Sequence, residues 1–398
     1  MTIKYSIVIP TKNRAYYLKY AIKSVLISPR QDIELVVSNN FSSDETSKIL
    51  SEINDSRMRV VSPDIALPMA AHYEFAISKA RGDWITILGD DDAVMPYIFE
   101  SLDKYILNYS NVDIISSARA YYFWEGCENI YGDLVVAYSS KFKDKVRSTK
   151  NDLYKALLGL RNFTDMPQLY TTGIIKKSLY EEIKLKCSGY FYHSIIPDVY
   201  SAVAICLARN SYLRIEEPLF WTGTSNKSMG ISNRIYLDAK HLTEKLKNNS
   251  IKIPKKISAD ISYYLHINNF SCMYIYECLL QCPLTSKSFR ASHWLRTLVL
   301  ATVYNQSKKK KKIEVRSKLL KVINFECKKY KIPDLRFKLI SFILLIISSL
   351  YYFFSAPQKI FKRLGVFGYI KFYSRQRKLF LNIFDASIKI SELRKKKL

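Results

Sequence analysis

The stretch "GDWITILGDDDAV", residues 82–94, passes from an apolar segment through a glycine into three consecutive aspartates. The apolar part is short and rich in β-branched and aromatic residues, which predicts a buried strand. Three adjacent carboxylates repel one another, and a bound cation would offset that cost. Hard Mg²⁺ and Mn²⁺ prefer oxygen ligands of this kind. The alternative is an acidic turn that caps the following helix.

Upstream of this stretch, strand patterns alternate with helical patterns. Apolar, β-branched runs occupy residues 5–10, 32–40, 58–62 and 83–89, and helical periodicity covers residues 15–28, 42–50 and 70–82. Ser42 and Glu45 have the spacing of a capping box at the start of the second helix. The alternation predicts an α/β fold, with an open and mostly parallel sheet and helices on both faces.

Polar clusters follow three of the predicted strands, at residues 10–14, 38–40 and 90–92. The carboxyl ends of parallel strands meet at one edge of a sheet, and ligands bind there. We therefore expect these clusters to form a single site.

The charge of the chain is unevenly distributed. The 398 residues carry a net charge of +27, of which residues 251–398 supply +24 from 31 basic and 7 acidic side chains. Residues 1–250 are almost balanced, as in an ordinary soluble domain. The basic appendage predicts an anionic partner, either a membrane surface or a nucleic acid.

The seven cysteines are scattered and form no Cys-x-x-Cys pair, which fits a reducing compartment. Cys278 and Cys282 lie one helical turn apart, but neither a third cysteine nor a histidine is near enough in sequence to complete a metal clip. The first ten residues read as a strand rather than as a signal peptide, so we expect the catalytic part to be cytoplasmic.

Three motifs in this order resemble the inverting glycosyltransferases of family two, which have the GT-A fold and include enzymes of bacterial surface polysaccharides. They are "SIVIPTKNRAYYLKYAIKSVL", "IELVVSNNFSSDET" and "ALPMAAHYEFAISKARGDWITILGDDDAVMP". The resemblance is strong over residues 3–115 and weak over 116–235. Lys12 stands where the family commonly has a tyrosine, and Asn39 and Asn40 replace its usual aspartates.

The resemblance implies roles for individual residues. Counting back from Pro96 puts Gly89 at the family's first acidic position and makes Asp91 the principal metal ligand. Asp92 is either a second ligand or a brace for the loop, and Mg²⁺ or Mn²⁺ is the implied ion. Contacts with the nucleotide-sugar are expected from seven residues, namely Pro10, Thr11, Asn13, Arg14, Asn39, Asn40 and Asp90.

The family also implies a carboxylate base near the end of the α/β domain, and Asp198 in "GYFYHSIIPDVYSAVAIC" matches that place. The alternative is that Asp198 is only the N-cap of the helix that follows. His193 is interpreted as a polar wall of the acceptor site. Lys227, in "FWTGTSNKSMG", is either a phosphate contact on a closing loop or part of an ordinary surface loop.

The implied reaction moves a sugar from a nucleotide-diphosphate donor, with UDP-sugar as the expected donor, to an acceptor hydroxyl with inversion. A metal would stabilise the leaving group, and a base would take the acceptor proton. The competing hypotheses are a sugar nucleotidyltransferase and a basic nucleic-acid-binding protein. The chain lacks the glycine-rich phosphate loop that a sugar nucleotidyltransferase would have. It also lacks a nucleic-acid recognition motif, so no nucleic acid is expected as a partner.

Residues 339–354 are sixteen residues without a charge, flanked by Arg336 and Lys338 on one side and further basic residues on the other. A span needs about 20 residues, so we favour a helix lying in the membrane interface. A spanning helix and a buried soluble helix are the alternatives. The interleaved aromatic and basic residues of 367–384 also suit an interface.

The sequence thus predicts four regions. Residues 1–115 and 116–235 would be the nucleotide-sugar-binding and acceptor-binding halves of a GT-A domain. Residues 236–335 would be a helical basic region, and 336–398 a membrane-associating helix with a basic tail. We expect a cytoplasmic protein attached peripherally to the inner face of the inner membrane, with a lipid-linked oligosaccharide or polysaccharide as acceptor.

Overall fold

The structure is a computed structural model. It describes residues 2–127, 135–140, 144–228, 271–307, 330–364, 369–375 and 382–395, with single positions between 317 and 328 and at 380. The lysine run at 308–312 and residues 229–270 lie outside this described part.

The first half of the sheet is the parallel arrangement that the sequence predicts. Its strands are β1 (Tyr5–Thr11), β2 (Ile33–Asn39), β3 (Met58–Val61) and β4 (Trp84–Ile87). They lie in the order β4-β1-β2-β3, and all three pairings are parallel. The intervening helices are α1 (Ala15–Leu26), α2 (Thr46–Ser51) and α3 (Met69–Ser78). The fold class is confirmed.

The second half of the sheet is mixed. After α4 (Ile98–Asn108), β6 (Ile114–Phe123) and β9 (Gly173–Lys176) extend the sheet, with β9 antiparallel between β4 and β6. The long β10 (Ser211–Thr224) runs parallel to β6 and antiparallel to β5 (Ala93–Val94). The pairing with β5 carries β10 past the acidic turn, which we define as Asp90, Asp91 and Asp92.

The remaining strands and helices extend this sheet or pack around it. They are β7 (Val135–Ser140), β8 (Lys145–Ser148), α6 (Thr149–Leu157), α7 (Lys177–Lys186), α8 (Pro197–Ala208), α12 (Ser271–Gln281), α13 (Lys287–Ala291), α14 (His293–Ser307), α16 (Asp334–Leu364), β11 (Tyr369–Arg375) and α17 (Ile383–Lys395).

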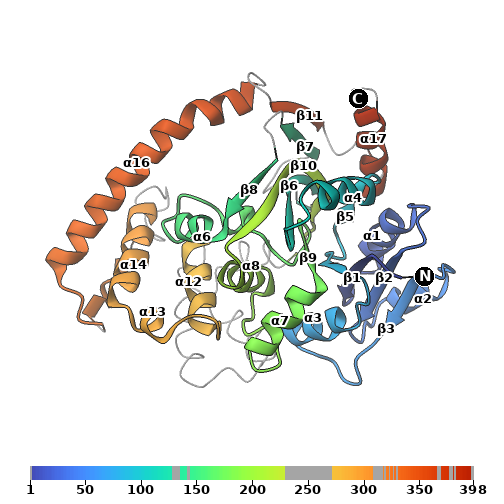
Figure 1. Cartoon of the computed structure of the whole chain (residues 1–398), viewed down its shortest axis with the longest axis horizontal. Coiled ribbons are helices and arrows are strands. Elements are labelled where there is room, and N and C mark those ends of the chain that lie inside the picture. The colour runs from blue at the N-terminus through green and yellow to red at the C-terminus, as the bar shows by residue number, and fades with distance from the viewer. Residues whose placement is uncertain are drawn as a thin grey trace.

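Two hydrophobic cores cover the two faces of the sheet, because successive side chains of a strand point to opposite faces. On β1, Val8 enters a core shared with α3, α8 and α12, whereas Ile7 and Ile9 enter a core shared with α1 and α4. Figure 1 shows these helices on either side of the central strands.

The predicted capping box does not form. Helix α2 begins at Thr46 with Glu45 as its N-cap, and the Ser42 hydroxyl accepts a hydrogen bond from the Asn13 backbone instead. The physical reason is tertiary, since the loop before α2 is used to hold the loop after β1.

The C-terminal segment differs from the predicted tail. Strand β11 pairs antiparallel with β7, and α17 packs against α1 (Figure 1). Helix α17 buries Ile383, Ala386 and Ile390 in the same core as Ile7. The end of the predicted 336–398 region, including Phe380 of the presumed interface segment, is therefore part of the catalytic domain. Of the apolar side chains that suggested a membrane interface, Phe380 and Ile383 are used for packing.

Residues 339–354 lie within α16, which extends along one side of the molecule (Figure 1). Ile340 and Leu344 pack against Ala301 of α14. The opposite face of α16 exposes six large apolar side chains, namely Leu335, Leu339, Phe342, Ile343, Ile346 and Leu350. In the part of the chain that the structure describes, no helix has the length and hydropathy needed to cross a membrane.

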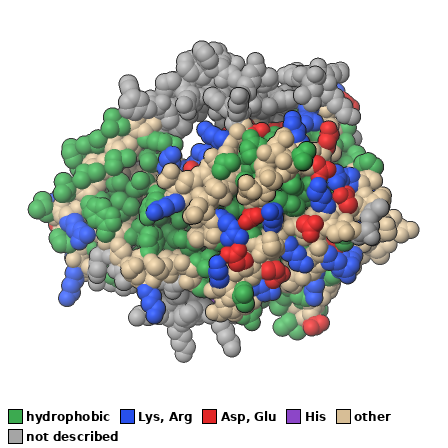
Figure 2. Space-filling model, viewed as in Figure 1, with side chains coloured by type: hydrophobic (Ala, Val, Ile, Leu, Met, Phe, Trp, Pro, Cys, Tyr) green, Lys and Arg blue, Asp and Glu red, His purple; other side chains and the backbone are tan. Residues whose placement is uncertain are grey.

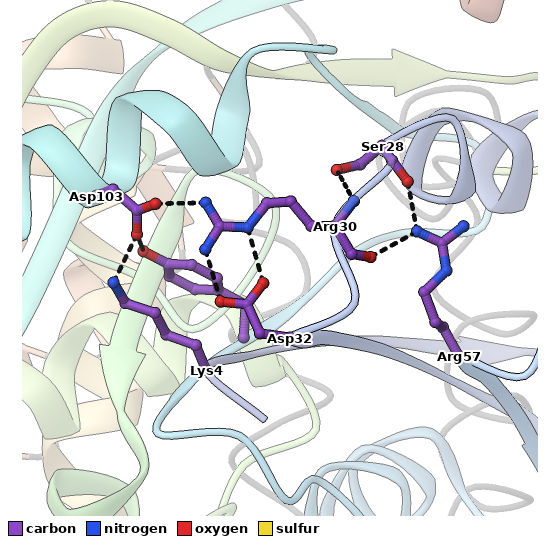
Figure 3. Close-up of polar contacts among 7 residues, drawn as sticks. Lys4, Ser28, Arg30, Asp32, Arg57 and Asp103 are labelled. Atoms are coloured by element: carbon purple, nitrogen blue, oxygen red, sulfur yellow. Dashed lines mark hydrogen bonds and ion pairs between the residues drawn. The ribbon is translucent and has the colours of Figure 1, made fainter. Parts of the chain in front are cut away.

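A network of charges joins the elements at the amino end of β1, away from the acidic turn (Figure 3). Asp103 of α4 accepts from Lys4 at 2.6 Å and from the Tyr5 hydroxyl at 2.7 Å, and it also contacts Arg30. Arg30 in turn binds Asp32 through two nitrogens. These charges are satisfied within the fold, so they mark a structural site.

Candidate active site

The acidic turn connects β4 to β5, and its three carboxylates have different surroundings. Asp92 Oδ1 accepts from the Gly223 N–H at 2.7 Å, and Oδ2 accepts from the Gly89 N–H at 3.1 Å and from the Thr171 hydroxyl. Burial, reinforced by the charge of Asp91, raises the pKa of Asp92 to about 8. Both oxygens of Asp92 hold the loop together, which matches a brace better than a metal ligand.

Asp91 is buried but keeps one oxygen unused. Its Oδ2 accepts from the hydroxyls of Ser225 and Ser228, both at 2.7 Å. Its backbone carbonyl accepts from the Trp124 indole at 2.8 Å. Among the described residues, none donates to Oδ1, so this oxygen is the one that the loop leaves for a ligand.

Asp90 is half-buried at the end of β1. It accepts from the Thr11 hydroxyl at 2.9 Å. Burial raises its pKa to about 7, and the nearby Arg14 acts in the opposite direction. A carboxylate in this state gains from a bound cation or from a hydrogen-bond donor on a ligand.

Gly89 occupies the position where the family has an acid, and the packing explains the difference. A Cβ added at Gly89 would lie 2.5 Å from Asp92 Oδ2 and 2.6 Å from the Tyr170 hydroxyl. Any side chain here would displace the brace that Asp92 provides.

The loop after β1 reaches two other loops at the same edge of the sheet. Asn13 has a left-handed backbone, with φ of 57°, and its side chain accepts from the Ser43 N–H at 2.7 Å. Arg14 donates to the Ser225 hydroxyl at 3.0 Å and to the Lys227 carbonyl. Pro10 and Thr11 are buried in β1. The predicted nucleotide-contacting residues are thus brought together.

Lys227 lies at this edge as well. Burial alone would raise the pKa of Asp44. Hydrogen bonds from the Thr46 hydroxyl and from backbone N–H groups outweigh this effect and lower the pKa, and the charge of Lys227 adds to the lowering. Lys227 therefore belongs to the loop cluster around Arg14 rather than to a separate surface loop.

The two asparagines at the end of β2 hold loops in place. Asn40 pairs with the backbone of Leu67, donating to its carbonyl and accepting from its N–H, both at 2.8 Å. Asn39 accepts from the Ser42 N–H and donates to the Ser47 hydroxyl. Their role as contacts to a nucleotide base stays a prediction, and the Asn40 amide already makes one donated and one accepted hydrogen bond within the protein.

Asp198 is not the N-cap of its helix. The N-cap of α8 is Ile196, Pro197 occupies the first helical position and Asp198 the second. Asp198 is half-buried. Burial raises its pKa, while N–H groups of the first turn and the charge of Arg119 partly oppose that effect. A carboxyl in this environment is suited to act as a general base.

His193 fastens a loop instead of facing a site. Its Nε2 lies 3.0 Å from the carbonyl oxygens of both Cys187 and Tyr190. The interpretation of His193 as a wall of the acceptor site therefore receives no support from its contacts.

The sequence analysis missed four residues near this edge. His72 lies 2.8 Å from the Ser38 hydroxyl, and burial lowers its pKa to about 4. Tyr73 and Tyr170 feel the charges of both the acidic turn and Asp198. Arg119 lowers the pKa of Asp92 and of Asp198. No motif marks these positions, and His72 and Tyr73 lie within α3 rather than directly after a strand.

The described carboxylates alone do not form a complete set of metal ligands. Across the described residues, no three His, Cys, Asp or Glu side chains converge as a set of metal ligands. A metal here would take Asp91 together with oxygens from outside the protein, as Mg²⁺ often does with substrate phosphates.

The parallel strands β4-β1-β2-β3 with polar clusters at their carboxyl ends fit the arrangement that the family resemblance implies, and a family comparison agrees. Residues 6–166 match the family described as "Glycosyl transferase family 2". This part of the chain belongs to glycosyltransferase family 2 and is an enzyme domain. The alternatives of a sugar nucleotidyltransferase and of a nucleic-acid-binding protein receive no support.

Individual relatives match over part of their length. "Glycosyltransferase GlyG" of Streptococcus pneumoniae serotype 4 is 30% identical over 130 residues, which are 30% of this chain and 42% of the relative. "GalNAc(5)-diNAcBac-PP-undecaprenol beta-1,3-glucosyltransferase" of Campylobacter jejuni is 30% identical over 95 residues, 23% of this chain and 31% of the relative. The match thus spans less than half the length of these relatives.

Among solved structures, that of Staphylococcus aureus TarS residues 1–349 in complex with UDP-GlcNAc resembles this fold. The TM-score is 0.46 at 15% identity, and the similarity covers 77% of this chain and 81% of TarS 1–349. A likeness of this degree describes the course of the chain and nothing of the site.

Proposed function

We propose that the protein transfers a sugar from a UDP-sugar to a hydroxyl of a lipid-linked or polysaccharide acceptor, with inversion. The family membership of residues 6–166 supports a nucleotide-sugar donor. One observation supports the proposal that the donor-binding carboxylates and the base act together. Tyr73 and Tyr170 lie within electrostatic reach of both the acidic turn and Asp198. This supports a single site that combines the carboxylates of the acidic turn with the proposed base Asp198.

The residues present fit a divalent cation. Burial raises the pKa of Asp90 and Asp92, so the protein alone does not stabilise their ionised forms, and a bound cation would do so. Asp91 would hold Mg²⁺ or Mn²⁺ through Oδ1, and Asp92 would brace the turn from behind. When bound, the cation would stabilise charge on the leaving diphosphate.

Asp198 would take the proton of the acceptor hydroxyl as that oxygen attacks the anomeric carbon. Arg14 would contact the donor phosphates, since it already joins the loops that border Asp90 and Asp91. Direct attack from the side opposite the diphosphate accounts for inversion.

A lipid-linked acceptor is supported by the name of the Campylobacter relative, which acts on a diphosphoundecaprenol-linked saccharide. It is also supported by α16, whose face opposite α14 carries a stripe of six exposed apolar side chains beside basic residues. Figure 2 shows hydrophobic side chains gathered on that side of the molecule, with Lys and Arg at its edges. This pattern fits a helix resting on an anionic membrane surface at the cytoplasmic face.

The central experiment is a donor screen that follows hydrolysis or transfer of nucleotide-sugars with Mg²⁺ or Mn²⁺. Asp91→Ala should lower activity by at least about 100-fold, because it removes the ligand of the cation. Asp83→Ala is the matched control, since Asp83 is exposed at the opposite end of β4. Full activity of Asp91→Ala would refute the metal assignment.

Membrane attachment is tested by flotation with vesicles that contain phosphatidylglycerol. The double variant Leu339→Ser and Phe342→Ser should reduce binding by about 10-fold or more, because it removes two exposed apolar groups that would insert into the membrane interface. Leu185→Ser is the control, since Leu185 of α7 is equally apolar and 81% exposed. Equal reductions in both proteins would argue against α16 as the lipid-binding element.

A further inference from the structure

Three tyrosine rings form a cluster beside the acidic turn. Tyr73 of α3 and Tyr170, just before β9, have ring centroids 6.3 Å apart and planes that differ by 19°. Tyr192 meets Tyr73 edge-on, with a centroid distance of 6.1 Å and an angle of 83°. Both Tyr73 and Tyr170 are half-buried.

The cluster lies where the reacting groups meet. Burial and then the charge of Asp90, followed by that of Asp198, raise the pKa of Tyr73. Burial and then the charge of Asp92 do the same for Tyr170, on which Asp198 also acts. The Tyr170 hydroxyl is close to Gly89, at the start of the acidic turn.

The rings are held in place by contacts of their neighbours. Thr171 has a left-handed backbone, with φ of 33°, and its hydroxyl binds Asp92. A strained residue of this kind persists only when its surroundings hold it there. On α3, Glu74 accepts from the N–H groups of Phe191 and Tyr192, at 2.8 and 3.0 Å.

The hydroxyls of Tyr73 and Tyr170 have no hydrogen-bond partner among the described residues. They would therefore be available to a ligand that combines an apolar face with a polar edge. A pyranose ring has this combination, because its C–H bonds form one face and its hydroxyls project from the rim. Half-buried tyrosines match both features.

We propose that Tyr73 and Tyr170 form a stacking platform for a neutral pyranose ring at the reaction centre. This inference rests on the proposed function and specifies the class of sugar. An acidic sugar is disfavoured, because the two rings and their hydroxyl groups supply no positive charge to pair with its carboxylate. The ring belongs either to the donor or to the acceptor, and the experiment separates these sources.

The test compares Tyr73→Leu and Tyr170→Leu with the corresponding Phe variants. Calorimetry gives the affinity for UDP and for UDP-glucose, UDP-galactose and UDP-N-acetylglucosamine in the presence of Mn²⁺. Saturation-transfer NMR gives the affinity for methyl glucoside, and for its uronic acid analogue, with UDP bound. Tyr154→Leu, in an exposed residue of α6, is the matched control.

If the platform holds the donor sugar, the Leu variants bind the preferred UDP-sugar about 3- to 10-fold more weakly while UDP affinity is unchanged. If it holds the acceptor ring, the same loss affects methyl glucoside alone. The Phe variants keep affinity within about 3-fold, because the ring remains. Circular dichroism identifies any variant that fails to fold, and the second tyrosine then supplies the test.

The platform is overturned if both Leu variants retain every affinity, or if the Phe variants lose as much as the Leu variants. Binding of the uronic acid as strongly as the neutral glucoside would also contradict it. If the wild-type protein binds UDP, but the Leu variants weaken binding of neither the UDP-sugar nor methyl glucoside, the platform alone is refuted. A wild-type protein that binds no nucleotide at all refutes the proposed function itself.

Discussion

Three neighbouring aspartates of identical chemistry acquire different tasks from their partners. Asp92 is enclosed by Gly223, Gly89 and Thr171, which bind both of its oxygens. Asp91 faces two serine hydroxyls and keeps one oxygen for a ligand. At the scale of single residues, hydrogen-bond donors from distant segments decide which carboxylate holds the loop and which keeps an oxygen open to a ligand.

Gly223 is a residue whose side chain would conflict directly with this arrangement. A Cβ there would lie 1.6 Å from the Asp91 carbonyl, so the strand and the turn would have to separate. Gly223→Ala should lower the free energy of unfolding by about 2 kcal/mol or more, measured by urea denaturation. Gly189→Ala is the control, because Gly189 has φ of 89° but open space around it and should cost about 1 kcal/mol. Equal losses would contradict the packing argument.

Asp198 gives a prediction about pH. Its pKa is raised by burial, so it is protonated at a higher pH than an ordinary carboxyl. The base must be ionised, and kcat/KM should therefore fall as pH decreases through this raised pKa. Asp198→Asn should lower kcat by about 100-fold or more while donor affinity is retained. A wild-type profile with no acidic limb above about pH 4 would contradict the assignment.

At the scale of elements, α12 contributes a buried acid to the core that supports α8. Glu277 is 6% exposed, and its carboxylate accepts weakly from Gln281 at 3.5 Å. Burial raises its pKa to about 7. This helix comes from the region that the sequence assigned to a basic appendage, yet it packs on the helix that presents Asp198.

The Glu277 carboxyl makes stability depend on pH. Because its pKa is higher in the folded state than in the unfolded chain, folding is favoured most below about pH 4.5 and loses that contribution as pH rises towards 7. Glu277→Gln should remove this loss, on the order of 3 kcal/mol at pH 8. Urea denaturation of both proteins at pH 5 and pH 8 tests it. An unchanged difference between the two pH values in the variant would refute it.

At the scale of the whole molecule, the C-terminal part packs against the α/β domain at two separate places, the edge of the sheet and helix α1. The chain leaves through α14 and α16, returns to the sheet edge as β11 and ends on α1 as α17. Arg394 near the end binds Glu217 of β10 at 2.7 Å. Both ends of the exposed helix α16 are thus connected to the folded domain, which would keep a membrane-bound α16 close to the active site.

This arrangement predicts that damage to α17 destabilises the catalytic domain. Ile383→Ala, in a fully buried residue, should lower the free energy of unfolding by about 2–4 kcal/mol. Ile343→Ala on the open face of α16, 44% exposed, should change it by less than about 0.5 kcal/mol. Donor binding measured in parallel should weaken only in the Ile383 variant near its unfolding transition. Equal stability of the two variants would show that α17 is not part of the core.

Several features were predictable because they depend on neighbouring residues in the chain. The strands β1, β2 and β4 follow from apolar, β-branched runs, and the helix face of Leu18, Ala21 and Val25 follows from helical spacing. The wrong predictions concern residues whose partners are distant. Ser42 lost its capping role to Asn13, and Phe380 entered a core instead of a membrane interface.

The sequence by itself determined the α/β alternation, the family and the position of the acidic turn at a strand end, because local periodicity and motif spacing encode them. Only the tertiary structure decided which aspartate is enclosed, that Tyr73 and Tyr170 stack on each other, and that α17 completes the core that contains Ile7 and Ile9. The physical reason is that these properties arise from contacts between segments up to several hundred residues apart. Hydrogen bonds and burial at those contacts set the charge and the accessibility of each group.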